Sequence, residues 1–402
     1  MNPPATIDLF CGAGGITEGF RQSGFRCLWA NDINKDALST FALNHPETIV
    51  EAGAVEGIDP RTVRSVLDIS KGQLDCLVGG PPCQGFSINA PDRVLDDPRN
   101  RLVRRFLDFV EEFEPKTVLI ENVPGMLSLA GGHVVSEILI RLRRLGYDTS
   151  HRVLFAAHYG VPQERWRLII LASRTGRVPV HPPPSFNAKA RANFTGGRLL
   201  TFRTGPLGEI WLQAPTTVGD ALDDLPPLKP GEGAERMPYR APAHSGYADM
   251  LRHGSTEVLN HVAPQISSVN LERLKHIQPG GSWRDIPFEL LPEGMKKARR
   301  SDHTRRYGRL RADGLSGTVM TKMDPHWGPA FHYSQSRTLT VREAARLQSF
   351  PDRYRFLGTR GAQYEQVGNA VPVMMARAIA DVLRQTLDAV PAQELLTVGN
   401  QL

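Results

Sequence analysis

Residues 8–15 read Asp-Leu-Phe-Cys-Gly-Ala-Gly-Gly, and this stretch decides the fold of the amino-terminal part of the chain. It follows a short apolar run and opens a helical pattern through Phe20, which is typical of a glycine-rich turn between a strand and a helix. The glycine spacing is tighter than the Gly-x-Gly-x-x-Gly of dinucleotide sites, and no Gly-Lys-Ser/Thr run follows it. The turn therefore favours a nucleoside without phosphates. The next apolar stretch ends at Asp32, whose carboxylate can bind the two hydroxyls of a ribose.

Apolar strands and amphipathic helices alternate from residue 6 to about residue 173. Such alternation predicts an α/β fold with a doubly wound, mostly parallel sheet. Residues 179–242 contain eleven prolines and seven glycines, which favours an irregular lobe over a continuation of the sheet. We place the boundary between the two parts near residue 175.

A second stretch, residues 79–87, reads Gly-Gly-Pro-Pro-Cys-Gln-Gly-Phe-Ser and follows the apolar run 74–78. Proline fixes φ, so Pro81 and Pro82 hold the approach of the Cys83 thiol rigid, while the glycines let a flat substrate come close. A thiol held in this way suits attack on an electron-poor ring. The alternative is a turn in which Cys83 only packs, but packing alone requires no such combination of residues.

A third stretch, residues 117–123, reads Thr-Val-Leu-Ile-Glu-Asn-Val and predicts a β-branched strand that ends on a carboxylate. In an apolar setting Glu121 can keep a proton and donate it to a ring nitrogen. Together with the thiolate of Cys83, it would form an acid-assisted nucleophilic pair. Alternatively, Glu121 caps the helix that follows.

Taken in order along the chain, these segments resemble the DNA cytosine-5 methyltransferases, and nearly the whole chain takes part in the resemblance. The matching motifs are Phe10-x-Gly12-x-Gly14, Pro82-Cys83-Gln84, Glu121-Asn122-Val123, Gln163-Glu164-Arg165-Trp166-Arg167, the stretch 337–351 and Gln366-Val367-Gly368-Asn369-Ala370-Val371-Pro372. The resemblance implies a Rossmann-like fold that binds S-adenosylmethionine, with a second, smaller and irregular target-recognition domain. The implied domains are a catalytic domain at 1–175, a target-recognition domain at 176–358 and a return segment at 359–402 that completes the catalytic domain.

The resemblance also implies roles for single residues. Cys83 would add to C6 of a cytosine while Glu121 donates to N3, and C5 would then take the methyl group. We expect Arg165 and Arg167 to lie on the same side of one strand and to face the site, and Asn122 to orient the surroundings of the base. The base that removes the C5 proton stays unassigned.

The implied cofactor is S-adenosylmethionine, and no metal is expected. The contacts to the cofactor would come from Phe10, Gly12, Ala13, Gly15, Asp32, Ile33, Val55, Pro82, Leu102, Asn369 and Val371. Two positions depart from the family pattern. Asp32 stands where the family usually has glutamate, and Ala54 stands where an acidic residue often holds the adenine amino group, so that either Glu56 replaces that contact or it is absent.

The implied partner is double-stranded DNA, from which the target cytosine must be rotated out before a thiol can reach it. The chain carries a net charge of +6, yet residues 296–311 alone carry +7, so the rest is close to neutral. That run predicts contacts to phosphates, which give little sequence information. The expected DNA contacts are Gln84, Ser87, Gln163, Lys296, Lys297, Arg299, Arg300, Arg305, Arg306, Arg309 and Arg311.

Composition excludes other classes of protein. The 402 residues include 41% hydrophobic and 22% charged ones, which excludes a disordered chain, and no apolar run approaches the roughly 20 residues of a membrane span. Neither a secretion signal nor a paired cysteine pattern is visible, so we expect neither disulfides nor a zinc site. We expect a monomer in the prokaryotic cytoplasm or nucleoid.

Three alternatives stay open at this point: a tRNA cytosine-5 methyltransferase, a catalytically silent DNA-binding regulator, and an NAD-dependent Rossmann enzyme. The long basic region disfavours the first, the complete set of catalytic residues disfavours the second, and the glycine spacing disfavours the third. The sequence does not reveal the DNA word or whether a cognate restriction endonuclease acts on the same site.

Overall fold

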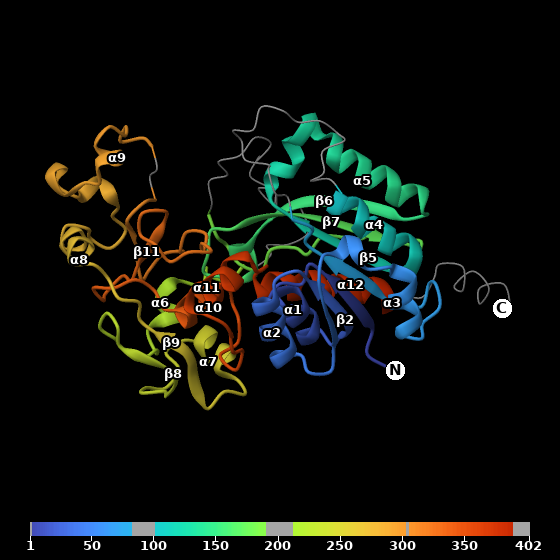
Figure 1. The fold of residues 1–402 in the computed structure, drawn as a ribbon, viewed down its shortest axis with the longest axis horizontal. Coiled ribbons are helices and arrows are strands. Elements are labelled where there is room, and N and C mark those ends of the chain that lie inside the picture. Colours follow the sequence, from blue (N-terminus) through green and yellow to red (C-terminus); the bar gives the residue numbers. More distant parts are fainter. Residues whose placement is uncertain (1, 83–100, 190–211, 303–304, 389–402) are drawn as a thin grey trace. The chain divides into compact units, whose positions relative to one another are not determined.

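The computed structural model of the chain describes residues 2–82, 101–189, 212–302 and 305–388. The chain divides into two compact units (Figure 1). The first unit comprises residues 1–155, 166–213 and 373–402, and the second comprises residues 156–165 and 214–372.

The first unit is built on a seven-stranded sheet in the order β3-β2-β1-β4-β5-β7-β6, as counted over the described residues. Strands β1 to β5 pair in parallel, and β7 runs antiparallel to both β5 and β6. The strands are β1 (Ala5–Leu9), β2 (Arg26–Asp32), β3 (Ile49–Ala52), β4 (Cys76–Gly79), β5 (Thr117–Asn122), β6 (Asp148–Phe155) and β7 (Trp166–Ser173). The predicted doubly wound, mostly parallel α/β fold is confirmed.

Helices cover both faces of this sheet (Figure 1). They are α1 (Gly15–Gln22), α2 (Lys35–Asn44), α3 (Pro60–Val66), α4 (Arg101–Phe113), α5 (His133–Arg144) and α12 (Val373–Asp388), with 3₁₀ segments at η1 (Val55–Gly57) and η3 (Pro124–Gly132). Helix α12, from the far end of the chain, packs against α1. At Gly19 the two helices are so close that an added Cβ would lie 2.6 Å from the Cβ of Ala376, and Arg384 Nη1 donates to the carbonyl of Ser23 at 2.7 Å.

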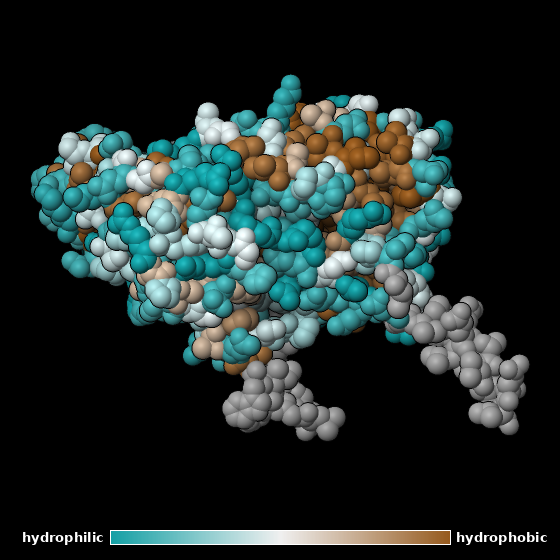
Figure 2. All heavy atoms as spheres, turned by 90° about the horizontal axis from the view of Figure 1, so that it is seen from below, coloured by the Kyte–Doolittle hydropathy of each residue, from teal (hydrophilic) through white to brown (hydrophobic). Residues whose placement is uncertain are grey.

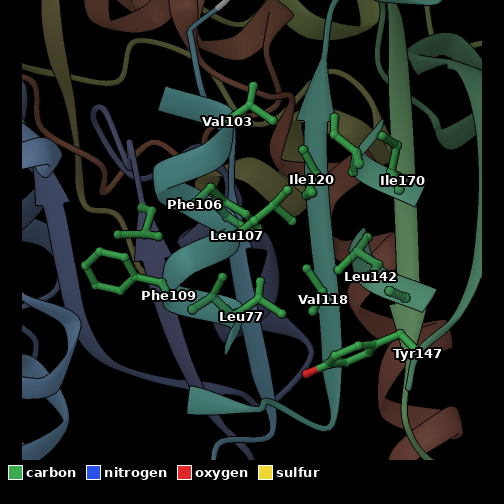
Figure 3. Close-up of a cluster of buried hydrophobic side chains, with 14 of the residues drawn as sticks. Leu77, Val103, Phe106, Leu107, Phe109, Val118, Ile120, Leu142, Tyr147 and Ile170 are labelled. Atoms are coloured by element: carbon green, nitrogen blue, oxygen red, sulfur yellow. The ribbon is translucent and has the colours of Figure 1, made fainter. Parts of the chain in front are cut away.

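The main core lies between the sheet and α4 and α5 (Figure 3). Phe106 and Leu107 of α4 are buried beside Leu77 of β4 and Val118 of β5. Each fully buried side chain of this size stabilises the fold by roughly 1.5–3 kcal/mol. The apolar residues of α4 recur every three or four positions, so this helix presents one face to the strands.

The second unit is mostly irregular, with short elements. Its helices are α6 (Val218–Leu222), α7 (Gly246–Arg252), α8 (Ser268–Lys275), α9 (Glu293–Lys296), α10 (Val341–Leu347) and α11 (Arg360–Asn369). Its 3₁₀ segments are η4 (Ala156–Tyr159), η5 (Trp283–Asp285) and η6 (Phe288–Leu290). Two small sheets pair β8 (Gly233–Pro238) with β9 (Glu257–Val262), and β10 (Gly308–Arg309) with β11 (Pro329–Phe331).

Charged side chains replace part of the apolar core of the second unit. The guanidinium of Arg346 on α10 bonds Asp224 and Asp352, and none of the three side chains is exposed. Arg337 forms a two-pronged pair with Glu343, at 2.7 and 2.6 Å. Glu343 also completes a capping box with Thr340 at the start of α10. Buried charges need such pairing, so this network fixes the position of α10 within its unit.

The two compact units differ from the sequence-based boundaries at residues 175 and 358. Residues 156–165 and all of α11 belong to the second unit, and only α12 returns to the first. The division into a catalytic and a target-recognition domain stays a prediction.

Among the described residues, no helix is long and apolar enough to cross a membrane. Figure 2 shows a face with many hydrophilic residues, one broad hydrophobic area and several smaller ones.

Candidate active site

The sheet order reverses between β1 and β4, and open α/β sheets bind ligands at the carboxyl ends of the strands at such a point. The strand register shows which residues meet there. Leu9 of β1 pairs with Gly79 of β4, and Gly79 pairs with Ile120 of β5. The glycine turn, the Gly-Pro-Pro stretch and Glu121 therefore leave the sheet side by side, although they are far apart in the sequence.

Glu121 is held by Arg167. β7 runs antiparallel to β5, so its first residues lie beside the last residues of β5. Arg167 Nε lies 2.6 Å from Glu121 Oε1, and the two side chains are only 14% and 13% exposed. The carboxylate thus has a fixed cationic partner and does not lie in the purely apolar setting expected from its strand. A cation in this place keeps the carboxyl oriented toward the strand ends.

The backbone before Cys83 is held by one hydrogen bond and passes close to Glu121. Asn122 Nδ2 donates to the carbonyl of Pro81 at 2.9 Å, and a Cβ added to Gly80 would lie 2.9 Å from Glu121 Oε2. A side chain at this position would displace the carboxyl of Glu121, which Arg167 holds. Cys83, Gln84 and Ser87 lie outside the described residues, and Pro82, the last described residue before them, is half-buried.

The glycine-rich turn has the tight geometry that its sequence indicates. Phe10, Gly12 and Gly14 have positive φ angles of 59°, 53° and 85°, a conformation that costs glycine little. Asp32 ties the turn to β2, because Gly12 N donates to its Oδ2 at 2.8 Å and Asn34 N donates to its Oδ1 at 2.8 Å. Each oxygen of Asp32 keeps one lone pair, so the expected ribose contact remains open to it.

The adenine side of the predicted cofactor site is formed by residues of different exposure. Ile33 is 71% exposed directly after β2, whereas Val55 is buried. Ala13 and Gly15 are buried, and Leu102 is half-buried against the main core. Ala54 and Glu56 are both exposed, so the chain carries a carboxylate next to the position where the family often has one.

Arg105 of α4 fixes the loop that carries Val55. Its Nε donates to the carbonyl of Val55 at 3.2 Å, its Nη2 donates to the carbonyl of Ile58, and its Nη1 pairs with Asp108 at 3.2 Å. The sequence did not predict this role of Arg105, because no local pattern indicates that residue 105 contacts the backbone at residue 55.

Asp8, near the end of β1, is a second residue whose role the sequence did not reveal. Thr17 Oγ1 donates to its Oδ2 at 2.6 Å, while its other carboxyl oxygen has no partner among the described residues. Burial raises the pKa of Asp8 to about 7, although the bond from Thr17 opposes the shift. The Asp8–Thr17 bond ties β1 to α1 across the glycine turn.

The first unit fits a nucleoside-containing cofactor such as S-adenosylmethionine. A Cβ added to Gly12 would meet nothing within 4 Å, so there is open space beside the turn. The exposed side chain of Ile33 offers an apolar face for a flat ring, and a carboxyl oxygen of Asp8 is buried without a partner among the described residues. No phosphate-binding cation takes part in the turn, which agrees with a nucleoside and not a nucleotide.

Cys11, Cys27 and Cys76 are buried and free. Burial raises the pKa of Cys27 and of Cys76 to about 12, and it raises the pKa of Cys11 well above its usual value. These thiols therefore stay protonated and unreactive near neutral pH. Among the described residues, no group of three or more His, Cys, Asp and Glu side chains gathers as a metal site requires.

Several predicted site residues belong to the second unit. Arg165 precedes β7, which begins at Trp166, and its guanidinium donates to the carbonyls of Gly368 at 2.9 Å and Val319 at 3.5 Å. The structure thus differs from the expectation that Arg165 and Arg167 share one face of a strand. Asn369 is exposed at the end of α11 and Val371 is buried, and their cofactor contacts stay predictions.

Gln163 is fully buried and uses its amide inside the second unit. It donates to the carbonyl of Leu347 at 3.0 Å and to Gln348 Oε1 at 2.9 Å, and it accepts from Val319 N at 2.9 Å. This arrangement disfavours the direct DNA contact expected for Gln163 and indicates a structural role.

The basic run 296–311 is less uniformly available than its charge indicates. Lys296, Arg305 and Arg311 pair with Glu293, Glu164 and Asp313 respectively. Arg309 is half-buried and donates to the carbonyls of His332 and Ile277, and burial lowers its pKa. Lys297, Arg299 and Arg300 are exposed, and Arg306 stacks on Trp327.

The sequence profile of the C-5 cytosine-specific DNA methylases matches residues 5–385 of the chain. The chain belongs to the C-5 cytosine-specific DNA methylase family. This DNA methylase is therefore an enzyme that methylates DNA at C5 of cytosine, and membership of the family implies dependence on S-adenosylmethionine. The resemblance found in the sequence is confirmed.

Two bacterial type II methyltransferases match this DNA methylase over most of their own length. It is 37% identical to the type II methyltransferase M.AgeI of Thalassovita gelatinovora, over 94% of this chain and 99% of that one. It is 34% identical to the type II methyltransferase M1.HphI of Haemophilus parahaemolyticus, over 94% of this chain and 86% of that one. A solved prophage-encoded DNA modification methyltransferase of E. coli superposes with a TM-score of 0.73 at 24% identity, covering 96% of this chain and all of that one, which shows a shared fold.

Proposed function

We propose that the first unit carries out covalent cytosine methylation at the carboxyl edge of its sheet, with Cys83 as the nucleophile and Glu121 as the acid. The observation that supports this proposal best is the Glu121–Arg167 pair, whose atoms lie 2.6 Å apart. It stands beside Gly80, three residues before Cys83. A carboxyl and a thiol brought to one edge can act on opposite parts of the same ring.

In the proposed reaction the thiolate of Cys83 forms a bond to C6 of the flipped cytosine. Glu121 donates a hydrogen bond or a proton to N3, so that negative charge does not accumulate on the ring and C5 becomes nucleophilic. S-adenosylmethionine supplies the electrophilic methyl group that C5 takes. A base then removes the proton from C5, the bond between Cys83 and C6 breaks, and 5-methylcytosine and the free thiolate remain. Arg167 keeps Glu121 in place, and Asn122 holds the backbone before Cys83 through Pro81.

The residues that would hold the cofactor follow from the same edge. The turn Phe10–Gly15 would lie beside the methionine part and Asp32 would accept from the ribose. Ile33 and Val55 would pack on the adenine, with Pro82 and Leu102 around the rest. The cofactor contacts of Asn369 and Val371 remain expectations from the family resemblance alone. Glu56 is the carboxylate that would bind the adenine amino group in place of the acidic residue absent at Ala54.

The proposed substrate is a specific short word in double-stranded DNA, bound by the second unit. Lys297, Arg299 and Arg300 would contact its phosphates. The cations of the same run that are paired with carboxylates would also do so, once a phosphate replaces the carboxylate. Several relatives are named type II methyltransferases. We therefore place the enzyme in a restriction-modification system, with a cognate endonuclease for the same word. An orphan enzyme is the alternative. In either case the enzyme would act as a monomer in the prokaryotic cytoplasm or nucleoid.

Methyl transfer from labelled S-adenosylmethionine tests the function directly. The wild-type enzyme should label unmethylated genomic DNA as 5-methylcytosine and leave total tRNA unlabelled, and Cys83→Ser should remove the label, because the weaker hydroxyl nucleophile cannot form the covalent adduct. Label on tRNA alone would point to an RNA methyltransferase. No label with the wild-type chain would favour a silent DNA-binding protein.

Arg105→Ala should weaken the binding of S-adenosylmethionine about 5- to 30-fold, because the loop at Val55 would lose two hydrogen bonds from a charged donor. Equilibrium dialysis without DNA measures this effect separately from catalysis. Arg104→Ala is the matched control on the same helix, since Arg104 pairs with Glu137 in a partly exposed position. Equal affinity in both variants would show that Arg105 does not position the loop.

A further inference from the structure

The second unit exposes a tryptophan on a loop that is fixed at several points. Trp327 is 56% exposed. Its N–H donates to the carbonyl of Asp324 at 3.1 Å, and His326 N donates to Asp324 Oδ1 at 2.9 Å. The carbonyl of Pro325 accepts from Tyr307 N at 2.6 Å. A single exposed apolar ring is common on protein surfaces, so the groups that lie against this ring decide what it can contact.

A guanidinium lies against this ring. The Cζ atom of Arg306 is 5.1 Å from the centroid of the Trp327 ring, and the edge of His326 contacts the same ring with centroids 5.0 Å apart. The carbonyl of Arg306 accepts from Trp283 N at 3.0 Å, so its backbone is anchored in the core of the unit. Among the described residues no carboxylate pairs with Arg306, in contrast to the neighbouring Arg305, which pairs with Glu164.

Another cation–aromatic pair of the same unit, formed by Lys296 and Phe288, lacks this character. Phe288 is 59% exposed, and Lys296 Nζ lies 5.7 Å from its ring centroid. Lys296 is neutralised by Glu293 at 2.5 Å, and its ammonium cannot make a two-pronged contact. The two pairs therefore differ in the property that matters for reading a base: Arg306 offers a planar donor that no carboxylate among the described residues neutralises, and Lys296 does not.

We propose that Arg306 recognises a guanine of the DNA recognition sequence. Trp327 is the positioning residue that holds the guanidinium of Arg306 in place for that contact. A planar guanidinium matches O6 and N7 of guanine in the major groove, which is the commonest specific contact between proteins and DNA. Stacking on an aromatic face leaves the donors at the edge of the guanidinium free. This inference rests on the proposed function. From its charge alone, Arg306 would be expected to contact phosphates, whereas here it recognises a base.

The test is the methylation profile on amplified, unmethylated bacterial genomic DNA, read by bisulfite sequencing. Arg306→Ala, Arg306→Lys and Trp327→Ala should each lose preference at one and the same guanine, by about 5- to 150-fold, which corresponds to roughly 1–3 kcal/mol per two-pronged base contact. Trp327→Phe should retain most of the preference, since it keeps an aromatic face. Phe288→Ala and Lys296→Ala are the matched controls and should keep the wild-type word.

The outcomes separate this inference from the proposed function. A wild-type chain that leaves no 5-methylcytosine in DNA would contradict the function itself. Active variants with an unchanged word would overturn the role of Arg306 and Trp327 alone. Retained preference in Arg306→Lys, with a uniform and salt-sensitive loss at all sites in Arg306→Ala, would show a phosphate contact instead. Thermal unfolding of each variant controls for loss of the folded unit.

Discussion

Glu121→Gln is expected to slow methyl transfer by about 10²- to 10⁴-fold, with little change in DNA binding. Glutamine keeps the shape of the side chain and can donate a hydrogen bond to N3, but it cannot transfer a proton. It also loses the ion pair with Arg167, whose atoms lie 2.6 Å apart. Single-turnover methylation of DNA with saturating cofactor measures the chemical step, and a gel-shift assay measures the binding.

A double-mutant cycle with Arg167→Ala tests whether Glu121 and Arg167 act as one unit. If Arg167 acts by holding Glu121, the double variant should be little slower than Glu121→Gln alone, because residues that act together are not additive. Independent roles would multiply the two losses. A full rate in Glu121→Gln would remove Glu121 from the mechanism. Glu114→Gln is a suitable control, since Glu114 pairs with Arg174 at a partly exposed position in the first unit.

Arg346→Ala is expected to lower the free energy of unfolding of the second unit by about 3–5 kcal/mol. The change would leave two buried carboxylates, Asp224 and Asp352, without the cation that bonds them both. Denaturant unfolding followed by tryptophan fluorescence, to which Trp283 in the core of that unit contributes, measures the effect. Arg236→Ala is the matched control, because its ion pair with Glu257 is on the surface and should contribute little.

The same network predicts how acid acts on the second unit. Burial alone would raise the pKa of Asp352, but its contacts with Arg346 dominate and lower it. A carboxyl whose pKa is lower in the folded state contributes stability above its unfolded value near 4, and this contribution is lost as the pH falls through the folded value. Arg346→Ala should therefore remove the part of the acid dependence that Asp352 contributes. An unchanged pH profile would assign that dependence to other carboxyls.

The sequence was sufficient for the first unit because each of its signals is local. A glycine turn with positive φ follows β1, a Gly-Pro-Pro stretch follows β4, and a carboxylate ends β5. Parallel strands bring their carboxyl ends to one edge, so local signals and general topology together place these groups side by side. The register of β1, β4 and β5 agrees with that reasoning.

Contacts between distant positions could not be predicted in this way. Arg105 reaches the loop at Val55, and the buried partners of Arg346 lie 122 and 6 residues away along the chain. Net charge was also an incomplete guide, because Glu164 and Asp313 neutralise parts of the basic run. A single sequence shows which residues are charged, but only the fold shows which charges are already paired.

The packing of α12 against α1 has a consequence for the order in which a newly made chain becomes active. Gly19 emerges from the ribosome long before Ala376, its close neighbour in the folded protein. The first unit therefore cannot complete its structure during synthesis until nearly all of the second unit has been translated, although domains generally fold as they emerge. The first unit of a nascent chain is therefore complete only after the residues of the second unit have been translated. At no time during translation does a finished first unit exist without them.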